Sequence, residues 1–261
     1  MAIAWADDFS YSYYENLLME IKSNFNQCIF SQVPELITRE YSKPALLLRH
    51  DVDLDLNKAL EMARLENKLG VKACYMIMVN CPFYSLKDQN NKTIISELTE
   101  MGIEIGLHFD TAGRANQVNP SDFRQLLDAI KADCRFLEDS LSVKVSSVSF
   151  HRPQKQLIGG SLLIEGLVNA YAADLMGWYL SDSKGNWREG EPIASIKNPK
   201  GKLLQLLVHP IWWDKTHATA IDRLQAFYDK SVKTLSIEES RNFDLQLSNH
   251  LSITRRLKAL D

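Results

Sequence analysis

Two aspartates separated by a single residue, Asp51 and Asp53, are the chemically most informative feature of the sequence. They follow the continuous apolar run 45–48, which is typical of a strand buried on both faces of a parallel sheet. Side chains two residues apart in a strand point the same way, so both carboxylates face one site, where they repel each other unless a cation or a proton compensates them. The pair therefore predicts a metal-assisted hydrolytic site at the ends of parallel strands.

Most of the histidines occupy equivalent places. Four of the six, His50, His108, His151 and His209, end apolar segments that resemble strands. In parallel α/β folds, sites form at the carboxyl ends of the strands, so residues distant in sequence can meet there. Strand alternation puts His108 and Asp110 on one side, whereas His50 alternates to the face opposite the aspartate pair. We expect His50 either to form hydrogen bonds behind the site or only to pack.

The elements that must position these residues alternate along the chain. Apolar residues at helical spacing predict an N-terminal amphipathic helix over about 11–25 and further helices over 54–69, 93–101 and 121–141. Strands are predicted over 45–48, 74–79, 103–108, 143–150, 178–180 and 203–208. Asp55 is expected to cap the second helix and Gly70 to end it. Repeated β/α alternation favours an α/β fold on a parallel sheet, either open or closed into a barrel.

The composition is that of an ordinary globular protein. With 261 residues, 45% apolar content and a net charge of −3, the chain can bury a large core and has no overall attraction for nucleic acid or an anionic membrane. No linker or repeat divides it, so we expect one domain over 1–261. The first residues lack a basic segment and no apolar run approaches the roughly 20 residues of a membrane helix, so a cytoplasmic protein without a membrane span is expected. The four cysteines lack paired spacing and are expected to be buried free thiols; the oligomeric state is not specified.

Five segments, in order, carry a family resemblance and span about two thirds of the chain. They are Arg49-His50-Asp51-Val52-Asp53, Glu104-Ile105-Gly106-Leu107-His108-Phe109-Asp110, Ser149-Phe150-His151-Arg152-Pro153, Ser181-Asp182-Ser183 with Trp187-Arg188-Glu189-Gly190, and His209-Pro210-Ile211-Trp212-Trp213. With these segments the sequence resembles the polysaccharide deacetylase superfamily, in particular its branch associated with polysaccharide biosynthesis. The resemblance implies a distorted (β/α) barrel of about seven parallel strands. It also implies hydrolysis of an N- or O-linked acetyl group on a sugar or glycan precursor.

Roles for individual residues follow from the resemblance. It makes Asp51 the general base and Asp53 and His108 ligands of a divalent metal ion, for which zinc is expected. It makes His209 the general acid that protonates the leaving amine or alcohol. Arg152, in the third motif, is expected to orient Asp51 through a charge-assisted hydrogen bond.

One position departs from the family pattern. The second motif usually contains another histidine four residues after the first, and here that position is Ala112. We take His151 as the third metal ligand, with Asp110 as the alternative. Asp182 and the aromatic pair Trp212 and Trp213 are assigned to substrate binding, because aromatic rings near a polar strand end suit stacking against a sugar; core packing is an equally good interpretation of each tryptophan.

Three other interpretations compete with a deacetylase. Loss of a ligand at Ala112 fits a catalytically degenerate protein that keeps the fold and binds carbohydrate. A DxD pair after a strand also occurs in magnesium-dependent phosphatases of the haloacid-dehalogenase type and in glycosyltransferases. Neither of those chemistries has an evident use for both His108 and His209, whereas hydrolysis of an acetyl group uses both.

Overall fold

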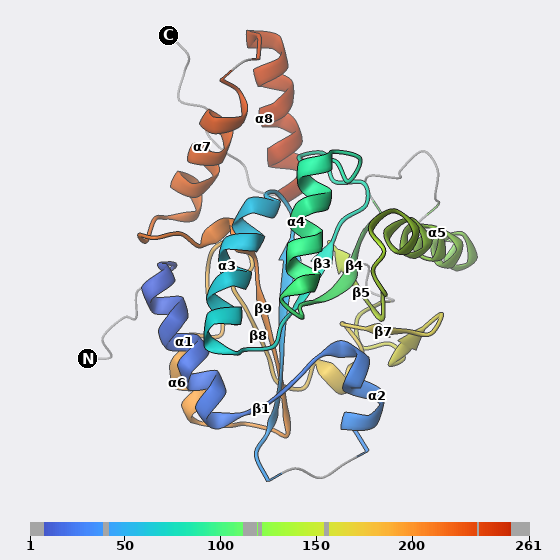
Figure 1. The fold of residues 1–261 in the computed structure, drawn as a ribbon, viewed down its shortest axis with the longest axis vertical. Helices are drawn as coiled ribbons and strands as arrows, with labels where there is room; N and C mark the ends of the chain where they lie inside the picture. Colours follow the sequence, from blue (N-terminus) through green and yellow to red (C-terminus); the bar gives the residue numbers. More distant parts are fainter. Residues whose placement is uncertain are drawn as a thin grey trace.

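A curved, mostly parallel sheet with helices packed around it forms the core of the protein (Figure 1). The computed structural model describes residues 8–38, 42–111, 119, 122–153, 157–233 and 235–251. The strands are β1 (Asn26–Cys28), β2 (Ala45–Val52), β3 (Cys74–Ile77), β4 (Glu104–Asp110), β5 (Ser147–His151), β6 (Leu163–Ile164), β7 (Leu167–Asn169), β8 (Tyr179–Ser181) and β9 (Leu203–Val208). The helices are α1 (Tyr11–Asn24), α2 (Val33–Leu36), α3 (Leu56–Leu69), α4 (Gln89–Glu100), α5 (Phe123–Leu141), α6 (Pro192–Lys197), α7 (Ala220–Ser231) and α8 (Ile237–Leu251), with short 3-10 helices η1 (Phe30–Gln32), η4 (Ala173–Leu175) and η5 (Pro210–Trp212).

The strands follow the order β6-β7-β5-β4-β3-β2-β9-β8, and β1 pairs in addition with the start of β2. From β7 to β8 every neighbouring pair is parallel, and β6 runs antiparallel beside β7. Within the described part of the chain no pairing joins β8 to β6 or β7, so the sheet curls without closing. The predicted α/β fold, a distorted barrel of parallel strands, is confirmed in this open form.

Local sequence explains why the elements begin and end where they do. All eight residues of β2 are buried, as the apolar run predicted. The predicted N-terminal helix is confirmed as α1. Asp55 caps α3 by accepting a hydrogen bond from the backbone N–H of Asn57, and Gly70 ends the helix with a left-handed φ of 66°. Helix α3 and the strand before it therefore form the expected β/α unit.

The carboxyl ends of the strands converge beneath α7 and α8 in Figure 1. The strand register determines which residues are neighbours at this end: His108 lies beside Ser149, and Asp110 lies beside His151. His50 lies beside Val208, which places His209 one step beyond, next to the aspartate pair. Residues from four separate parts of the sequence are thus brought to one end of the sheet.

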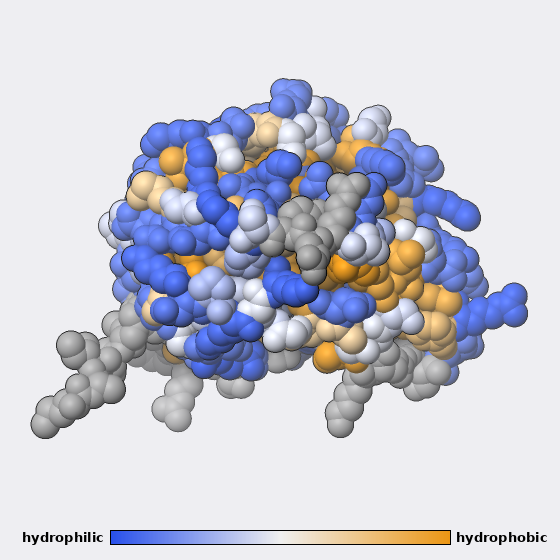
Figure 2. Space-filling model, turned by 90° about the horizontal axis from the view of Figure 1, so that it is seen from below, coloured by the Kyte–Doolittle hydropathy of each residue, from blue (hydrophilic) through white to orange (hydrophobic). Residues whose placement is uncertain are grey.

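Figure 2 shows the molecule from the opposite end, at which the strands begin; hydrophilic residues cover most of this face, with apolar groups among them. A cavity of about 580 Å³ lies at this end, between Leu36, Pro44 and Leu203. Among the described residues, none of the helices is long and apolar enough to cross a membrane. The cysteines are free thiols, and the expectation of burial holds for all but Cys81, which is partly exposed.

Candidate metal and catalytic site

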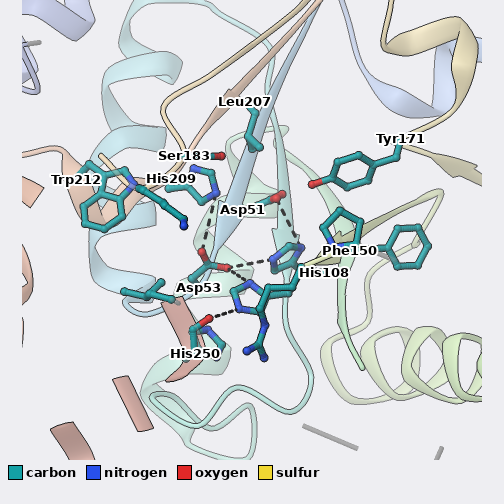
Figure 3. A pocket seen from close by; sticks show the side chains of 15 residues that line it. Asp51, Asp53, His108, Phe150, Tyr171, Ser183, Leu207, His209, Trp212 and His250 are labelled. Carbon is teal, nitrogen blue, oxygen red and sulfur yellow. Dashed lines mark hydrogen bonds and ion pairs between the residues drawn. The ribbon is translucent and has the colours of Figure 1, made fainter. Parts of the chain in front are cut away.

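Asp53, His108 and His151, from the ends of β2, β4 and β5, meet in one pocket. Figure 3 shows Asp53 and His108 pointing toward each other there. His108 Nε2 lies 3.0 Å from Asp53 Oδ1, and His151 Nδ1 lies 3.2 Å from the same oxygen. The two imidazole rings meet edge to face, with an interplanar angle of 83°. Each residue thus directs one donor atom to a common point. The structure brings His151, and not Asp110, together with the two expected ligands Asp53 and His108.

This donor set fits a divalent transition metal. Asp53 Oδ1 and His108 Nε2 are buried and lie within ion-pair distance of each other, but neither makes a hydrogen bond of good geometry among the described residues, an arrangement that is costly unless another group satisfies both atoms. Ligands of a tetrahedral zinc ion, bound at about 2.0–2.1 Å, lie about 3.3 Å apart, close to the two separations found here. Two imidazole nitrogens and a carboxylate oxygen suit zinc, cobalt or iron and leave a coordination position open.

Ser149 determines which nitrogen of His108 carries the proton. Its Oγ lies 3.2 Å from Asp51 Oδ1 and 2.6 Å from His108 Nδ1. An ionised carboxylate only accepts, so the single hydroxyl proton of Ser149 goes to Asp51, and Ser149 accepts from His108 Nδ1–H. The lone pair of His108 is then on Nε2, the atom that faces Asp53. Ser149 therefore holds His108 in the tautomer that binds a metal ion.

Asp51 lies beside His108 of this candidate metal site and is paired with Arg49. The guanidinium donates from Nε to Asp51 Oδ1 at 2.8 Å and from Nη2 to Oδ2 at 2.6 Å, and both side chains are buried. Burial alone would raise the pKa of Asp51, but the charge and hydrogen bonds of Arg49, with a contribution from His108, lower it to about 2. Asp51 is therefore ionised throughout the neutral range.

The prediction that Arg152 donates a hydrogen bond to Asp51 is wrong, because Arg49 donates to both carboxylate oxygens of Asp51. Arg152 Nη2 instead lies 3.4 Å from both carboxylate oxygens of Asp110, and its Nη1 donates to the backbone oxygen of Asn249 at 2.9 Å. The physical reason is local, because a left-handed backbone at Arg152 (φ 54°) ends β5 and leads the side chain toward α8.

His209, which follows β9, is held by Asp182, which follows β8. The backbone N–H and the ring Nδ1 of His209 both donate to the carboxylate, the ring at 2.6 Å, and Trp213 Nε1 donates to its other oxygen at 2.9 Å. Burial would lower the pKa of His209, but the charge of Asp182 and its hydrogen bond raise it to about 9. His209 Nε2 lies 4.0 Å from Asp53 Oδ2. A protonated nitrogen therefore faces the pocket at neutral pH.

The pocket has a volume of about 140 Å³, and Trp212, Leu207, Phe150 and Tyr171 contribute apolar walls to it. Of the three residues assigned to substrate binding, Trp212 lines the pocket. Asp182 and Trp213 are not among the described residues that line it, and both have no exposed surface. Their contact with each other explains why, since the indole donates to the carboxylate that holds His209. These two assignments are therefore corrected from substrate contact to support of His209.

A second group, Asp110, His151 and His250, also brings three possible ligand atoms together. The rings of His151 and His250, however, are stacked, with centroids 4.2 Å apart and planes 19° apart. Imidazole lone pairs lie in the ring plane, so two stacked rings cannot both direct them at one ion. Asp110 is also next to the guanidinium of Arg152. The first group is therefore the better metal site.

Sequence reasoning missed three residues of the site. Arg49 is on the same face of β2 as Asp51, so strand alternation contained that signal; Ser149 stands in the third motif. His250 lies on α8 and follows no strand, so the position of histidines at strand ends does not point to it. His50 lies behind the sheet as expected, where its Nε2 is 2.6 Å from a buried oxygen of Glu66. Ala112 lies outside the described residues.

Comparisons with known proteins gave matches in structure only. No family model matches the sequence, and no curated protein matches it either. The chain is similar to the Streptococcus pyogenes deacetylase PplD, solved in complex with acetate, with 12% identity and a TM-score of 0.41 over 52% of this chain and 60% of that one. It is similar to the Bacillus subtilis peptidoglycan deacetylase PdaC, with 14% identity and a TM-score of 0.40 over 83% of this chain and 100% of that one.

A further match is a CE4 family pseudoenzyme from Bacillus anthracis, with 14% identity and a TM-score of 0.43 over 77% of this chain and 66% of that one. This chain thus spans less than two thirds of the S. pyogenes and B. anthracis proteins. All these TM-scores lie below 0.5. The solved structures named here are two deacetylases and a CE4 family pseudoenzyme.

Proposed function

We propose that this protein is a metal-dependent hydrolase that removes an acetyl group from a sugar or a glycan precursor. The observation that carries the proposal is the convergence of a metal-binding group, an ionised carboxylate and a protonated histidine in one pocket. Asp53, His108 and His151 hold the divalent ion. When bound, that ion supplies Lewis-acid polarisation of the acetyl carbonyl and activation of water.

Asp51 and His209 move the protons. Asp51, ionised and oriented by Arg49 and Ser149, accepts the proton of the attacking water. His209 Nε2–H donates a proton to the leaving nitrogen or oxygen, while Asp182 stabilises the imidazolium before the transfer. The two groups start in opposite protonation states, as a base and an acid in one hydrolytic step must.

Pocket size limits which part of the substrate enters. Sites for whole drug-sized ligands are about 300–1,000 Å³, and this pocket is about 140 Å³. An acetyl group fits, whereas the sugar ring that carries it stays outside the pocket; Trp212, which is 2% exposed, contributes to the apolar wall around the acetyl group. The identity of the metal as zinc and a place in polysaccharide biosynthesis are parts of the proposal that rest on the motif resemblance.

The test separates the roles of the two aspartates. We expect Asp51→Asn to keep the divalent metal content of the wild type but to lose acetate release from N-acetylglucosamine oligomers. Asp53→Ala and His108→Ala should lose the metal as well as the activity. Asp55→Ser, which keeps a side chain able to cap α3, is the matched control and should behave as the wild type. Equal metal loss in the three site variants, or no metal uptake by the wild type, contradicts the proposal.

A carbohydrate-binding protein that has lost catalysis is the second candidate. One observation favours it: the pKa of Asp51 is about 2, far from the neutral value at which a general base is most effective. In that case the wild type binds metal and N-acetylglucosamine oligomers but releases no acetate. Isothermal titration with the oligomers, run beside the acetate assay, distinguishes the two.

A further inference from the structure

The last turn of α8 packs against the metal-binding pocket (Figure 3). The backbone oxygen of His250 lies 2.7 Å from His151 Nε2, and the backbone oxygen of Asn249 accepts from Arg152 at 2.9 Å. The ring of His250 stacks on that of His151, and His250 is only 5% exposed. A helix from the end of the described chain thus contacts two consecutive residues at the end of β5.

The contact with the His250 oxygen has a chemical consequence. A carbonyl oxygen only accepts, so His151 Nε2 must carry a proton in this hydrogen bond. With Nε2 protonated, the metal-binding lone pair of a neutral imidazole is on Nδ1, and Nδ1 is the atom 3.2 Å from Asp53 Oδ1. The carbonyl therefore selects the tautomer of His151 that a metal ion at Asp53 requires.

We propose that α8 is a positioning element of the metal centre: the His250 carbonyl selects the Nε2–H tautomer of His151, and the stacked His250 ring fixes the plane of the His151 imidazole. The inference rests on the proposed function, because it concerns the same metal site. It explains how His151, which terminates a strand and precedes a left-handed residue, is held for ligation. It also makes metal affinity depend on the docking of α8.

Apolar contacts hold α8 in place. The ring of Phe243 on α8 packs against Phe83, with centroids 5.3 Å apart, and against Phe227 of α7 at 6.0 Å. Phe83 also meets the ring of His250, at 5.2 Å. Leu247, one turn before the contact with His151, is 2% exposed, whereas Leu245 on the same helix is 61% exposed. These two leucines provide a matched pair for undocking the helix.

The experiment compares Leu247→Asp with Leu245→Asp in the full chain. A buried aspartate displaces α8, whereas an exposed one leaves it docked. We measure zinc affinity by competition with a chromogenic chelator. Loss of the outer hydrogen-bond partner of a metal-binding histidine typically weakens binding 10–100-fold, so we expect a loss of about that size in Leu247→Asp and a change below about twofold in Leu245→Asp. Equal affinities in the two variants overturn the inference.

A second measurement applies even if Leu247→Asp fails to fold, as judged by circular dichroism. The 15N chemical shifts of the His151 ring in the zinc-loaded wild type report which nitrogen binds the metal. Coordination through Nδ1 supports the inference, and coordination through Nε2 overturns it. A wild type that takes up no zinc contradicts the proposed function itself, whereas equal zinc binding by the two leucine variants contradicts only the role of α8.

Discussion

Arg49 and Asp51, two residues apart on β2, form a bidentate ion pair that is buried inside the sheet. Strand alternation brings the two side chains to the same face, and the fork of the guanidinium matches both carboxylate oxygens. The pair orients Asp51 next to Asp53 and His108, but it also lowers the pKa of the Asp51 carboxyl group to about 2. Arg49 therefore fixes the position of the Asp51 carboxylate and at the same time makes it a weaker base.

Removing the guanidinium should destabilise the fold. Breaking a buried ion pair by deleting one partner costs about 3–5 kcal/mol, because the other charge stays buried without compensation. We expect Arg49→Met to lower the free energy of unfolding by about this amount, measured by urea denaturation. In Arg49→Met with Asp51→Leu much of the loss should return. If the double variant lost as much unfolding free energy as the two single variants together, the two residues would not be coupled.

The alkaline limit of activity should be set by His209. Its pKa is raised from 6.5 to about 9, so the donating form is present below pH 9 and is lost above it, while Asp51 is ionised at all pH values above about 2. Acetate release from N-acetylglucosamine oligomers should therefore fall as the pH rises through about 9. In Asp182→Asn the carboxylate charge is gone, and the limit should move toward pH 6.5.

A control for this limit is 4-nitrophenyl acetate, whose leaving group needs no proton. Its hydrolysis should show no fall near pH 9 assignable to His209. The idea fails if Asp182→Asn leaves the alkaline limit of the oligomer reaction where it is in the wild type. In the metal-free protein the same raised pKa contributes stability that is fully present below pH 6.5 and is lost as the pH rises through about 9.

The third metal ligand should be His151 and not Asp110. His151 Nδ1 is close to Asp53, whereas Asp110 faces Arg152. We expect His151→Ala to lose most of the bound zinc, measured by atomic emission after dialysis. Asp110→Asn, which keeps the shape of the side chain, should retain it. The reverse order of metal loss would assign the site to Asp110.

A side chain at Gly106 should destabilise the fold. A Cβ at this position would lie 2.3 Å from Met76 Sδ and 2.6 Å from Ser147 Oγ, inside the sheet and two residues before His108. Extra atoms in a packed core typically cost 1–3 kcal/mol, so Gly106→Ala should lower the free energy of unfolding by about 1–3 kcal/mol. Gly106→Ala combined with Met76→Val, which removes the nearest atom, should recover part of this loss. Thermal and urea denaturation of both variants test this explanation. If Gly106→Ala were as stable as the wild type, the steric explanation would be refuted.

Local patterns were sufficient for the sheet and for much of the site. The apolar run before Asp51 predicted β2, and the two-residue repeat of a strand predicted that Asp51 and Asp53 share a face. The same repeat put His50 on the other face, where it meets Glu66. These conclusions depend only on neighbours in sequence, which is why they could be reached without the structure.

The missing parts depend on contacts between distant residues. Arg152 was expected at Asp51, but a positive φ at the end of β5 is not visible in the residue type, and the side chain turns toward Asp110. His250 lies almost one hundred positions after its partner His151 and follows no strand. Trp213 was equally well interpreted as substrate contact or core, and only its bond to Asp182 decides between them.

The pairing of β9 with β2 has a consequence for how the chain is made. Strand β2 is complete once residue 52 has been synthesised, but its partner on one side, β9, begins at residue 203. Until then the apolar segment Ala45–Leu48 has an unpaired edge, and unpaired apolar edges favour aggregation. Helix α3 follows β2 directly in the chain and can cover one face of it early. The edge of β2 that pairs with β9 stays unpaired until most of the polypeptide has been made. This edge of β2 can therefore be paired only after β9 has been synthesised, which makes the β2–β9 contact a non-local and intrinsically slow one to form.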